Sequence, residues 1–340
     1  MAACDCISLA HPDADRRTIA RSDEVDVLPS LGLQTMIEKT SIRGTFRNVI
    51  LGLIAAMLML TGADCSAAVL NSPTAAGKAG YDVHRDVVFD PAHKLALDVY
   101  TPKDALHAPV VVFFYGGAWQ TGSRREYRFV GSALAPEGVV VVIPDYRKYP
   151  QVTLDGFMSD ATDAVGWTRT HISAYGGAPD IIFLMGYSAG AQMGALLSTD
   201  SGWLAKVGMK PRDLAGFIGL AGPYRFPQIT DPDLMNILGS TPEQQRRSQP
   251  FDFVDGDEPP MLLLQGDADR MVNPANAATL MYALRAYREP AELHLYPGVD
   301  HDAIVQSLSR ASSLHDQEMA QIMAFIRAHS AGAPSKSQLP

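Results

Sequence analysis

The chain has 340 residues, of which 47% are hydrophobic and 19% charged, and this composition excludes an intrinsically disordered protein. Its 28 basic and 37 acidic residues give a net charge of −9. Binding to a phosphate backbone needs a basic face, so this balance argues against nucleic acid as a partner. The three cysteines, Cys4, Cys6 and Cys65, all lie near the amino terminus. Disulfides and thiolate zinc sites are therefore excluded from the rest of the chain.

An apolar run over residues 49–60 follows three basic residues and precedes a stretch of small residues. This order is typical of a signal peptide. About 15 apolar or small residues suit a signal peptide better than a membrane span, which needs about 20. We therefore expect cleavage near Ala67 and export to the periplasm or out of the cell. The alternative is a membrane anchor formed by residues 49–63.

The chain is accordingly divided into three parts. Residues 1–67 are predicted to be a polar extension plus the signal peptide. A signal peptide does not normally follow such a long polar stretch, so Met36 is the expected true start. Residues 68–330 are predicted to form a single domain, and residues 331–340 a disordered tail.

From about residue 80, short apolar runs alternate with longer helical patterns, which predicts an α/β fold with a parallel sheet. Most of these runs are unbroken, as in strands covered by helices on both faces. The expected strands are 83–90, 95–100, 109–115, 139–144, 181–185, 216–220, 260–265 and 291–296. The expected helices lie near 123–135, 155–174, 189–199, 274–288 and 311–329.

The segment over residues 223–259 does not follow this alternation. It is rich in proline, aspartate and glutamine and contains no clear strand. At about 37 residues it exceeds an ordinary connection, and long loops of this kind often cover binding sites. We expect a lid-like insertion here.

The most specific motif is Gly186-Tyr-Ser-Ala-Gly190, placed where an apolar run ends and a helical pattern begins. A nucleophile elbow needs such a strand-to-helix turn, because its serine takes a strained backbone conformation and its close neighbours must be small. Ser188 is therefore the candidate nucleophile. The alternative is a glycine-rich packing turn without chemistry.

A serine hydroxyl becomes nucleophilic when a positioned base removes its proton and a carboxylate orients that base. Of the nine histidines, His301 alone follows the last expected strand in a loop rich in turn formers, so it is the candidate base. Two aspartates follow the strand 260–265. Asp269 stands far enough past the strand end to reach the histidine loop, whereas Asp267 is placed to hold the turn. We favour Asp269 as the acid.

The transition state also needs donors for its developing oxyanion. Two glycines and an alanine leave the strand 109–115, and their backbone N–H groups can approach a substrate closely. Gly117 and Ala118, with Ala189 after the nucleophile, are the expected oxyanion hole. The alternative is a plain glycine turn.

No pattern indicates a cofactor or a metal: the sequence lacks His-Glu-x-x-His, a phosphate-cradling loop and a dinucleotide fingerprint. Asp160 and Asp163 are expected on the solvated face of a helix. Arg124 and Arg125 are expected to open a helix and to face solvent.

These motifs together resemble the α/β-hydrolase superfamily, in particular its carboxylesterase and lipase branch with an HGG(G/A)W-type oxyanion loop. Within residues 84–328 the resemblance is closest to the feruloyl-esterase-like and prenylcysteine methylesterase-like groups. It rests on the oxyanion loop, on Asp145-Tyr-Arg147, on the stretch 171–177, on the run from Leu184 to Gly190 and on the stretch 266–269. It implies an eight-stranded, mostly parallel sheet with the second strand antiparallel, and a triad of Ser188, Asp269 and His301.

The sequence departs from that pattern at two positions. Tyr115 stands where many relatives have a histidine that braces the oxyanion loop, and its hydroxyl can form a similar hydrogen bond. Tyr187 replaces the histidine or aspartate often found there, which alters the wall of the pocket. Trp119 is a candidate for lining the pocket, although an aromatic residue there fits the core equally well.

The sequence thus predicts an exported serine carboxylesterase that hydrolyses small esters through an acyl-enzyme and needs no cofactor. An amidase or arylformamidase would use the same triad, and a non-catalytic binding protein with a hydrolase fold is a second alternative. The sequence leaves the preferred ester and the oligomeric state open.

Overall fold

The computed structural model of the chain describes residues 80–226, 229–309 and 312–330. The predicted extension, signal peptide and tail lie outside these ranges. In chain order the strands are β1 Tyr81–Asp90, β2 Leu95–Pro102, β3 Ala108–Phe114, β4 Val140–Pro144, β5 Gly177–Tyr187, β6 Gly216–Leu220, β7 Met261–Gly266 and β8 Ala291–Tyr296. The α-helices are α2 Arg128–Leu134, α3 Leu154–His171, α4 Ala189–Thr199, α5 Ser201–Leu204, α6 Pro232–Leu238, α7 Pro242–Arg247, α8 Ala275–Ala286, α9 His301–Gln306 and α10 His315–Ser330.

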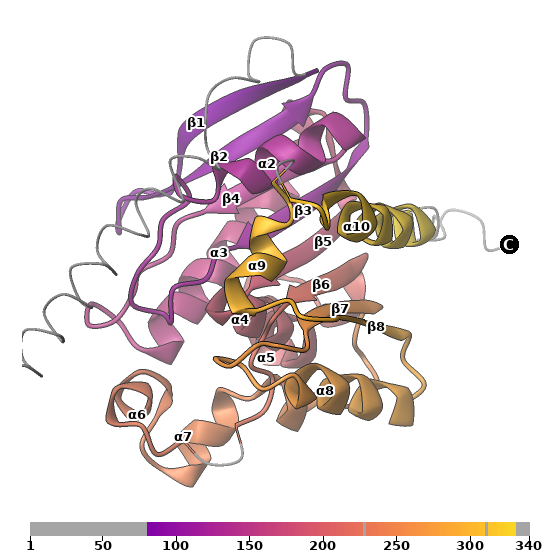
Figure 1. Cartoon of the computed structure of the whole chain (residues 1–340). Helices are drawn as coiled ribbons and strands as arrows, with labels where there is room; N and C mark the ends of the chain where they lie inside the picture. The colour runs from indigo at the N-terminus through magenta and orange to yellow at the C-terminus, as the bar shows by residue number, and fades with distance from the viewer. Residues whose placement is uncertain (1–79, 227–228, 310–311, 331–340) are drawn as a thin grey trace, which may run out of the picture. The chain divides into compact units, whose positions relative to one another are not determined.

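The eight strands form one sheet in the order β1-β2-β4-β3-β5-β6-β7-β8 (Figure 1). Strand β2 is antiparallel to both of its neighbours, and the pairs from β4–β3 through β7–β8 are parallel. The fold is therefore an α/β-hydrolase fold, and the predicted eight-stranded sheet with its antiparallel second strand is confirmed.

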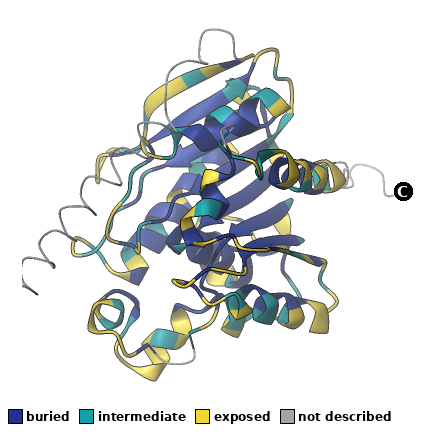
Figure 2. Cartoon of the chain, in the orientation of Figure 1, coloured by how far each residue is buried: buried dark blue, intermediate teal, exposed yellow. Residues whose placement is uncertain are grey.

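Helices cover both faces of this sheet, as the unbroken apolar strands require. Phe183 of β5 contacts Phe325 of α10, which places α10 on one face. Phe183 pairs with Gly216 of β6, so the side chain of the following residue, Phe217, points to the opposite face. The Phe217 ring lies against Gly194 of α4, which places α4 on that face. Figure 2 shows the result: the central strands are buried, and exposed positions lie on the outer sides of the helices, on loops and on the edge strand β1.

The register also places buried apolar residues side by side in the middle of the sheet. Val112 of β3 pairs with Val142 of β4 on one side and with Leu184 of β5 on the other. All three side chains are 0% exposed. This row of branched apolar residues therefore packs the centre of the sheet away from solvent.

The segment over residues 223–259 contains α6, α7 and a 3-10 helix at Pro250–Phe253. Its described residues form no strand, as expected. None of the helices in the described ranges combines the length and apolar character that a bilayer crossing requires.

One carboxyl group is buried in the core without a hydrogen-bond partner among the described residues. Glu318 of α10 is 0% exposed, and neither of its carboxyl oxygens is paired. Burial raises its pKa well above the ordinary value of 4.5. Between the ordinary pKa and this raised pKa, the folded state keeps the carboxyl group protonated, whereas the unfolded chain ionises it.

We expect Glu318→Met to increase the free energy of unfolding by about 1–3 kcal/mol at pH 8, because an unsatisfied polar group leaves the core. Above pH 4.5 the unfolded state loses this proton more readily than the folded state, so the stability of the wild type falls as the pH rises. The gain from the substitution should thus be larger at pH 8 than at pH 5. Urea titrations of both proteins at these two pH values test this, and an equal gain at both would contradict it.

Candidate active site

Four loops that leave the carboxyl ends of strands bring the predicted site residues together. Ser188 follows β5, Asp269 follows β7 and His301 follows β8. Gly117 and Ala118 follow β3, which lies next to β5. Carboxyl ends of parallel strands share one edge of a sheet, so residues far apart in the sequence meet there.

Ser188 lies on a sharp turn between β5 and α4. Its backbone angles, φ of 52° and ψ of −120°, fall in a region that residues other than glycine rarely adopt. The neighbouring glycines make this turn possible, because a Cβ on Gly190 would lie 2.0 Å from the carbonyl oxygen of Phe114. A Cβ on Gly186 would lie 2.3 Å from the carbonyl oxygen of Gly190. The motif therefore forms a strained elbow that lifts the serine hydroxyl above the sheet.

The three polar side chains form a continuous hydrogen-bonded chain. His301 Nε2 lies 2.9 Å from Ser188 Oγ, and its Nδ1 lies 2.8 Å from Asp269 Oδ2. The histidine and the aspartate are buried, whereas the serine is partly exposed. This geometry suits a base that takes the hydroxyl proton at one nitrogen while the other donates to a carboxylate.

The surroundings of Asp269 keep it ionised. Burial acts to raise its pKa, but hydrogen bonds from His301 and from the backbone N–H of Val272 outweigh this and hold the pKa below its ordinary value. Its Oδ1 accepts from the backbone N–H groups of Met271 and Val272, and its Oδ2 accepts from His301 and from the Gln265 amide. Every acceptor direction is fixed, so the carboxylate is rigidly aimed at the imidazole.

Asp267 has a different place. It is exposed, and its Oδ1 accepts the backbone N–H of Gly298 at 2.7 Å. It thus ties the loop after β7 to the loop after β8. Of the two aspartates that the sequence offered, Asp269 is the one that contacts His301.

His301 was expected within a loop, but the structure corrects this: it is the first residue of α9. Asp300 caps this helix, because its side chain accepts the backbone N–H of Ala303 at 2.9 Å. The turn-forming residues before His301 therefore end in a helix cap, and the helix adds rigidity to the position of the imidazole.

The loop after β3 carries Gly117 and Ala118, two of the three predicted oxyanion donors. Gly117, Ala118 and Trp119 all have positive φ, at 126°, 52° and 60°. Ala118 is exposed and Gly117 partly exposed, whereas Ala189 is buried at the first position of α4. Backbone N–H groups in the first turn of a helix have no partner within that helix. The positive end of the α4 dipole adds to the attraction for an anion at this point.

Tyr115 holds the start of this loop in place through hydrogen bonds. Its hydroxyl donates to Asp145 Oδ1 at 3.1 Å, and its carbonyl oxygen accepts from the Tyr146 hydroxyl at 2.8 Å. Lys148 Nζ lies 3.1 Å from the same Tyr115 hydroxyl. Burial raises the pKa of Tyr115 well above its ordinary value, so the phenol stays protonated. The hydroxyl thus forms the kind of bracing hydrogen bond that the sequence suggested.

Trp119 and Tyr187, the two predicted pocket residues, are each 4% exposed. The Trp119 ring stacks on Phe157, and its Nε1 donates to Gln192 Oε1 at 3.2 Å. The Tyr187 hydroxyl donates to Asp302 Oδ1 at 2.6 Å, next to His301. Both side chains therefore support the site from the interior rather than offering a large exposed face.

Arg124 was expected in solvent at the start of a helix, and this was wrong. Helix α2 begins at Arg128, and the Arg124 side chain is 8% exposed. Its guanidinium pairs with Asp98 at 2.9 Å and also with Asp86 and Asp145. Because Asp145 also accepts the Tyr115 hydroxyl, this cluster extends to the base of the oxyanion loop.

We expect Arg124→Met to lower the free energy of unfolding by about 3–5 kcal/mol, because it leaves the buried carboxylate of Asp98 without its cation. Arg125→Met is the matched control: that side chain is 64% exposed, and its removal should change stability by less than about 0.5 kcal/mol. Chemical denaturation of both variants measures the difference. Equal effects would show that the buried cluster adds nothing to stability.

Asp160 was expected on a solvated helix face, and this was also wrong. It is 1% exposed and accepts the guanidinium and the backbone N–H of Arg147. Asp163, one turn further along α3, is exposed as expected.

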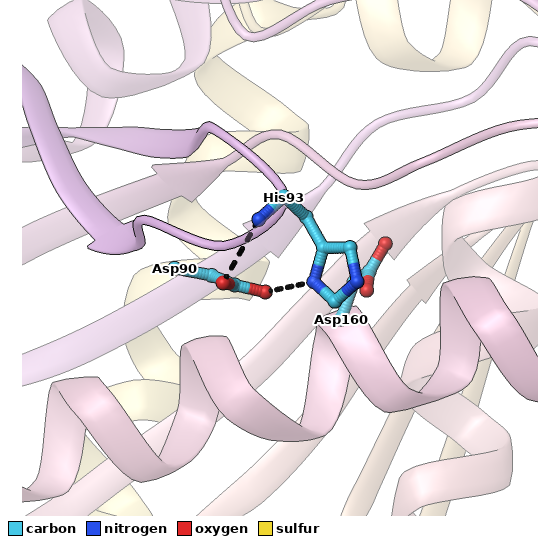
Figure 3. Close-up of side chains that lie close together, drawn as sticks. All are labelled: Asp90, His93 and Asp160. Atoms are coloured by element: carbon cyan, nitrogen blue, oxygen red, sulfur yellow. Dashed lines mark hydrogen bonds and ion pairs between the residues drawn. The ribbon is translucent and has the colours of Figure 1, made fainter.

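In the described part of the chain, one group of three side chains has the spacing of metal ligands: Asp90, His93 and Asp160 (Figure 3). His93 Nδ1 already bonds to Asp90 at 2.5 Å, and both oxygens of Asp160 accept from Arg147. A cation would have to compete with the Arg147 guanidinium, whose charge opposes it. The group is better explained as two separate ion pairs: Asp90–His93 closes the β1–β2 turn, and Asp160–Arg147 joins α3 to the loop after β4.

A cavity of about 1050 Å³ lies in the segment that was expected to form a lid. Its wall includes Phe226, Ile229 and Met235, together with Gln245 and Gln249. Charged side chains of both signs also line it: Arg225, Glu243, Arg246 and Asp252.

Sequence reasoning missed Gln192, which connects Trp119 to this segment. Its Nε2 donates to the Ser248 carbonyl oxygen at 2.6 Å. A signal was present, because Gln192 is the only polar residue between Ser188 and Ser198 and stands one helical turn after the nucleophile.

The chain is similar in sequence to known esterases. The BD-FAE family model matches residues 97–284, which is more than half of the chain. The chain is 31% identical over 280 residues to an isoprenylcysteine alpha-carbonyl methylesterase of Arabidopsis thaliana, covering 76% of this chain and 65% of that protein. It is 29% identical over 242 residues to esterase LipC of Mycobacterium tuberculosis, covering 64% of this chain and 60% of that protein. The chain thus spans about two thirds or less of the length of these relatives.

Solved structures show the same fold. A truncated carbohydrate esterase from gut microbiota superimposes with a TM-score of 0.64 at 18% identity, covering 75% of this chain and 99% of that one. Butyrate-bound esterase 2 of Thermogutta terrifontis superimposes with a TM-score of 0.59 at 22% identity, covering 75% of this chain and 96% of that one. From its fold and from the match of its sequence to the family model, the chain belongs to the BD-FAE family of α/β-hydrolase carboxylesterases.

Proposed function

We propose that the chain is a serine carboxylesterase that hydrolyses small carboxylic esters through an acyl-enzyme. The observation that carries this proposal is the position of His301 between Ser188 Oγ, at 2.9 Å, and Asp269 Oδ2, at 2.8 Å. The esterase names of the relatives and the family match support it.

In the proposed reaction, Nδ1–H of His301 donates to Asp269, which leaves Nε2 free to accept the proton of Ser188. Ser188 Oγ attacks the ester carbonyl, and the backbone N–H groups of Gly117, Ala118 and Ala189 stabilise the oxyanion. The protonated imidazole then gives its proton to the departing alcohol. Water, activated by the same histidine, attacks the acyl-enzyme and releases the acid.

A series of p-nitrophenyl esters of increasing acyl length, incubated with residues 68–340, tests this proposal. We expect faster hydrolysis of short acyl chains, because the buried Trp119 and Tyr187 leave little exposed apolar surface beside the nucleophile. Absence of turnover by folded protein would overturn the esterase proposal and leave two alternatives, an amidase or arylformamidase and a hydrolase-fold binding protein.

The matching p-nitroanilides and an aryl formamide separate an esterase from an amidase or arylformamidase. The same triad can attack both kinds of carbonyl, but an amide needs more help for its poorer leaving group. We expect the ester to react faster at equal acyl length. A faster anilide or formamide would assign the chain to the amide-cleaving class.

We also propose that the chain is exported, on the basis of the basic, apolar and small residues between Lys39 and Ala68, which lie outside the described residues. Expression of the full chain in a Gram-negative host, followed by cell fractionation and amino-terminal sequencing, tests this. A soluble periplasmic protein that begins near Ala67 is expected. A membrane-bound protein that retains residues 49–63 would instead support the anchor.

A further inference from the structure

The oxyanion loop is held in a conformation that its own residues do not favour. Ala118 and Trp119 are consecutive non-glycine residues with φ of 52° and 60°. Such residues cost roughly 1–3 kcal/mol each and persist only where their surroundings hold them. The contacts that hold Trp119 therefore decide where the N–H groups of Gly117 and Ala118 point.

Backbone contacts supply part of this support. The N–H groups of Gln120 and Thr121 both donate to the Gly117 carbonyl oxygen at 2.9 Å. The Trp119 carbonyl oxygen accepts the N–H of Tyr149 at 2.9 Å. These bonds close the turn, but they leave the direction of the Trp119 side chain open.

Besides its stacking on Phe157, the Trp119 side chain is held by a hydrogen bond to one buried amide. Gln192 is 0% exposed, and its Oε1 accepts Trp119 Nε1–H at 3.2 Å. Its Nε2 donates to the Ser248 carbonyl oxygen at 2.6 Å. The amide cannot turn over without placing a donor against the indole N–H and an acceptor against a carbonyl oxygen, so its orientation is determined.

Gln192 is also tied to the nucleophile. Its backbone N–H donates to the Ser188 carbonyl oxygen at 3.1 Å, one turn along α4. One residue therefore contacts the turn that carries Ser188, the loop that carries the oxyanion donors, and Ser248 at the end of α7. Ser248 directly precedes Gln249, which lines the cavity in the 223–259 segment.

We propose that Gln192 is a positioning residue for ester hydrolysis: it sets the distance between the oxyanion donors and Ser188, and it makes that distance depend on the 223–259 segment. This inference rests on the proposed esterase function. Gln192 acts through Trp119, while the donors remain the backbone groups of Gly117 and Ala118. A displaced donor mainly raises the barrier of the chemical step, so the effect falls on kcat rather than on KM.

The test uses Gln192→Met, which keeps the length of the side chain and removes the amide, and Trp119→Phe, which removes the indole N–H and keeps a ring against Phe157. We expect each variant to lower kcat by about 10- to 100-fold on a short p-nitrophenyl ester, with KM changed by less than about 3-fold. Because both variants break the same hydrogen bond, the double variant should be no slower than the slower single variant.

Ser198→Ala is the matched control. Ser198 is a buried residue of the same helix whose hydroxyl donates to the Gly194 carbonyl oxygen. It should keep kcat within about 2-fold, although it too loses a buried hydrogen bond. Thermal unfolding of all variants is measured in parallel.

Three results would overturn the inference: an unchanged kcat in folded Gln192→Met, equal losses in kcat for Gln192→Met and the Ser198 control, or fully additive losses in the double variant. If Gln192→Met does not fold, Trp119→Phe alone must still show the drop in kcat. An inactive wild-type protein would instead refute the proposed function, so the two failures are distinguishable.

Discussion

Replacing Ser188 by alanine is expected to lower kcat on a p-nitrophenyl ester by at least about 10⁴-fold, because the acyl-enzyme can no longer form. The residual rate should reflect binding and the oxyanion donors alone. The Ser188 hydroxyl lies 2.9 Å from His301 Nε2. The strained backbone of Ser188 holds the hydroxyl in this position. Steady-state kinetics on purified wild type and Ser188→Ala measure the loss.

The Ser198→Ala variant serves again as the control, because it removes a serine hydroxyl from the same helix at a buried position. It should retain at least half of the wild-type rate. Loss of activity in both variants would point to a general sensitivity of α4. Full activity in Ser188→Ala would exclude the serine as nucleophile.

The second large effect is expected for Asp269→Asn, with a loss of about 10³–10⁴-fold in kcat at neutral pH. The reason lies in the partners of the carboxylate. Two backbone N–H groups donate to Oδ1, so the asparagine oxygen must take that place and its NH₂ group faces His301 Nδ1. The imidazole then carries its proton on Nε2 and cannot accept one from Ser188.

Asp267→Asn provides the matched control, since the same change is made two residues away on an exposed side chain that holds the Gly298 N–H. Its kcat should stay within a few-fold of the wild type. A larger loss in Asp267→Asn than in Asp269→Asn would reverse the assignment of the acid.

The sheet was predictable because its strands are buried on both faces. Strands β6 and β8 have the bounds that the apolar runs indicated, and so does α4. Strand β5 extends further, from Gly177, because Gly177 pairs with Ala108 of β3; an irregular stretch that includes a proline and an aspartate follows before regular pairing resumes at Ile182. The apolar pattern of the sequence identifies the buried centre of a strand, whereas hydrogen-bonded pairing with the neighbouring strands determines where the strand ends.

The site was predictable for a related reason. Residues at the carboxyl ends of parallel strands must share one edge, so the order of Ser188, Asp269 and His301 along the chain was enough to place them near one another. Helix α9 was missed, because the residues before His301 are turn formers and the same aspartate that favours a turn also caps a helix.

The errors at Arg124 and Asp160 have a different physical origin. A charged residue is exposed unless a partner of opposite charge compensates its burial. The partners of Arg124 lie 21, 26 and 38 residues away in the sequence, and that of Asp160 lies 13 residues away. Only the folded arrangement of β1, β2 and the loop after β4 brings them together. Gln192 was missed for the same reason, because its hydrogen-bond partner Ser248 is 56 residues away in the sequence.

The most direct test of Ser188 as the nucleophile is to identify the residue with which a fluorophosphonate probe reacts. The assignment of Ser188 as the nucleophile predicts that the probe adds one phosphonyl group to the wild type and that peptide mapping by mass spectrometry places it on Ser188. The Ser198→Ala control should react equally, whereas Ser188→Ala should stay unlabelled. Ester turnover by a wild-type protein that remains unlabelled, or that carries the probe on another residue, would contradict this assignment.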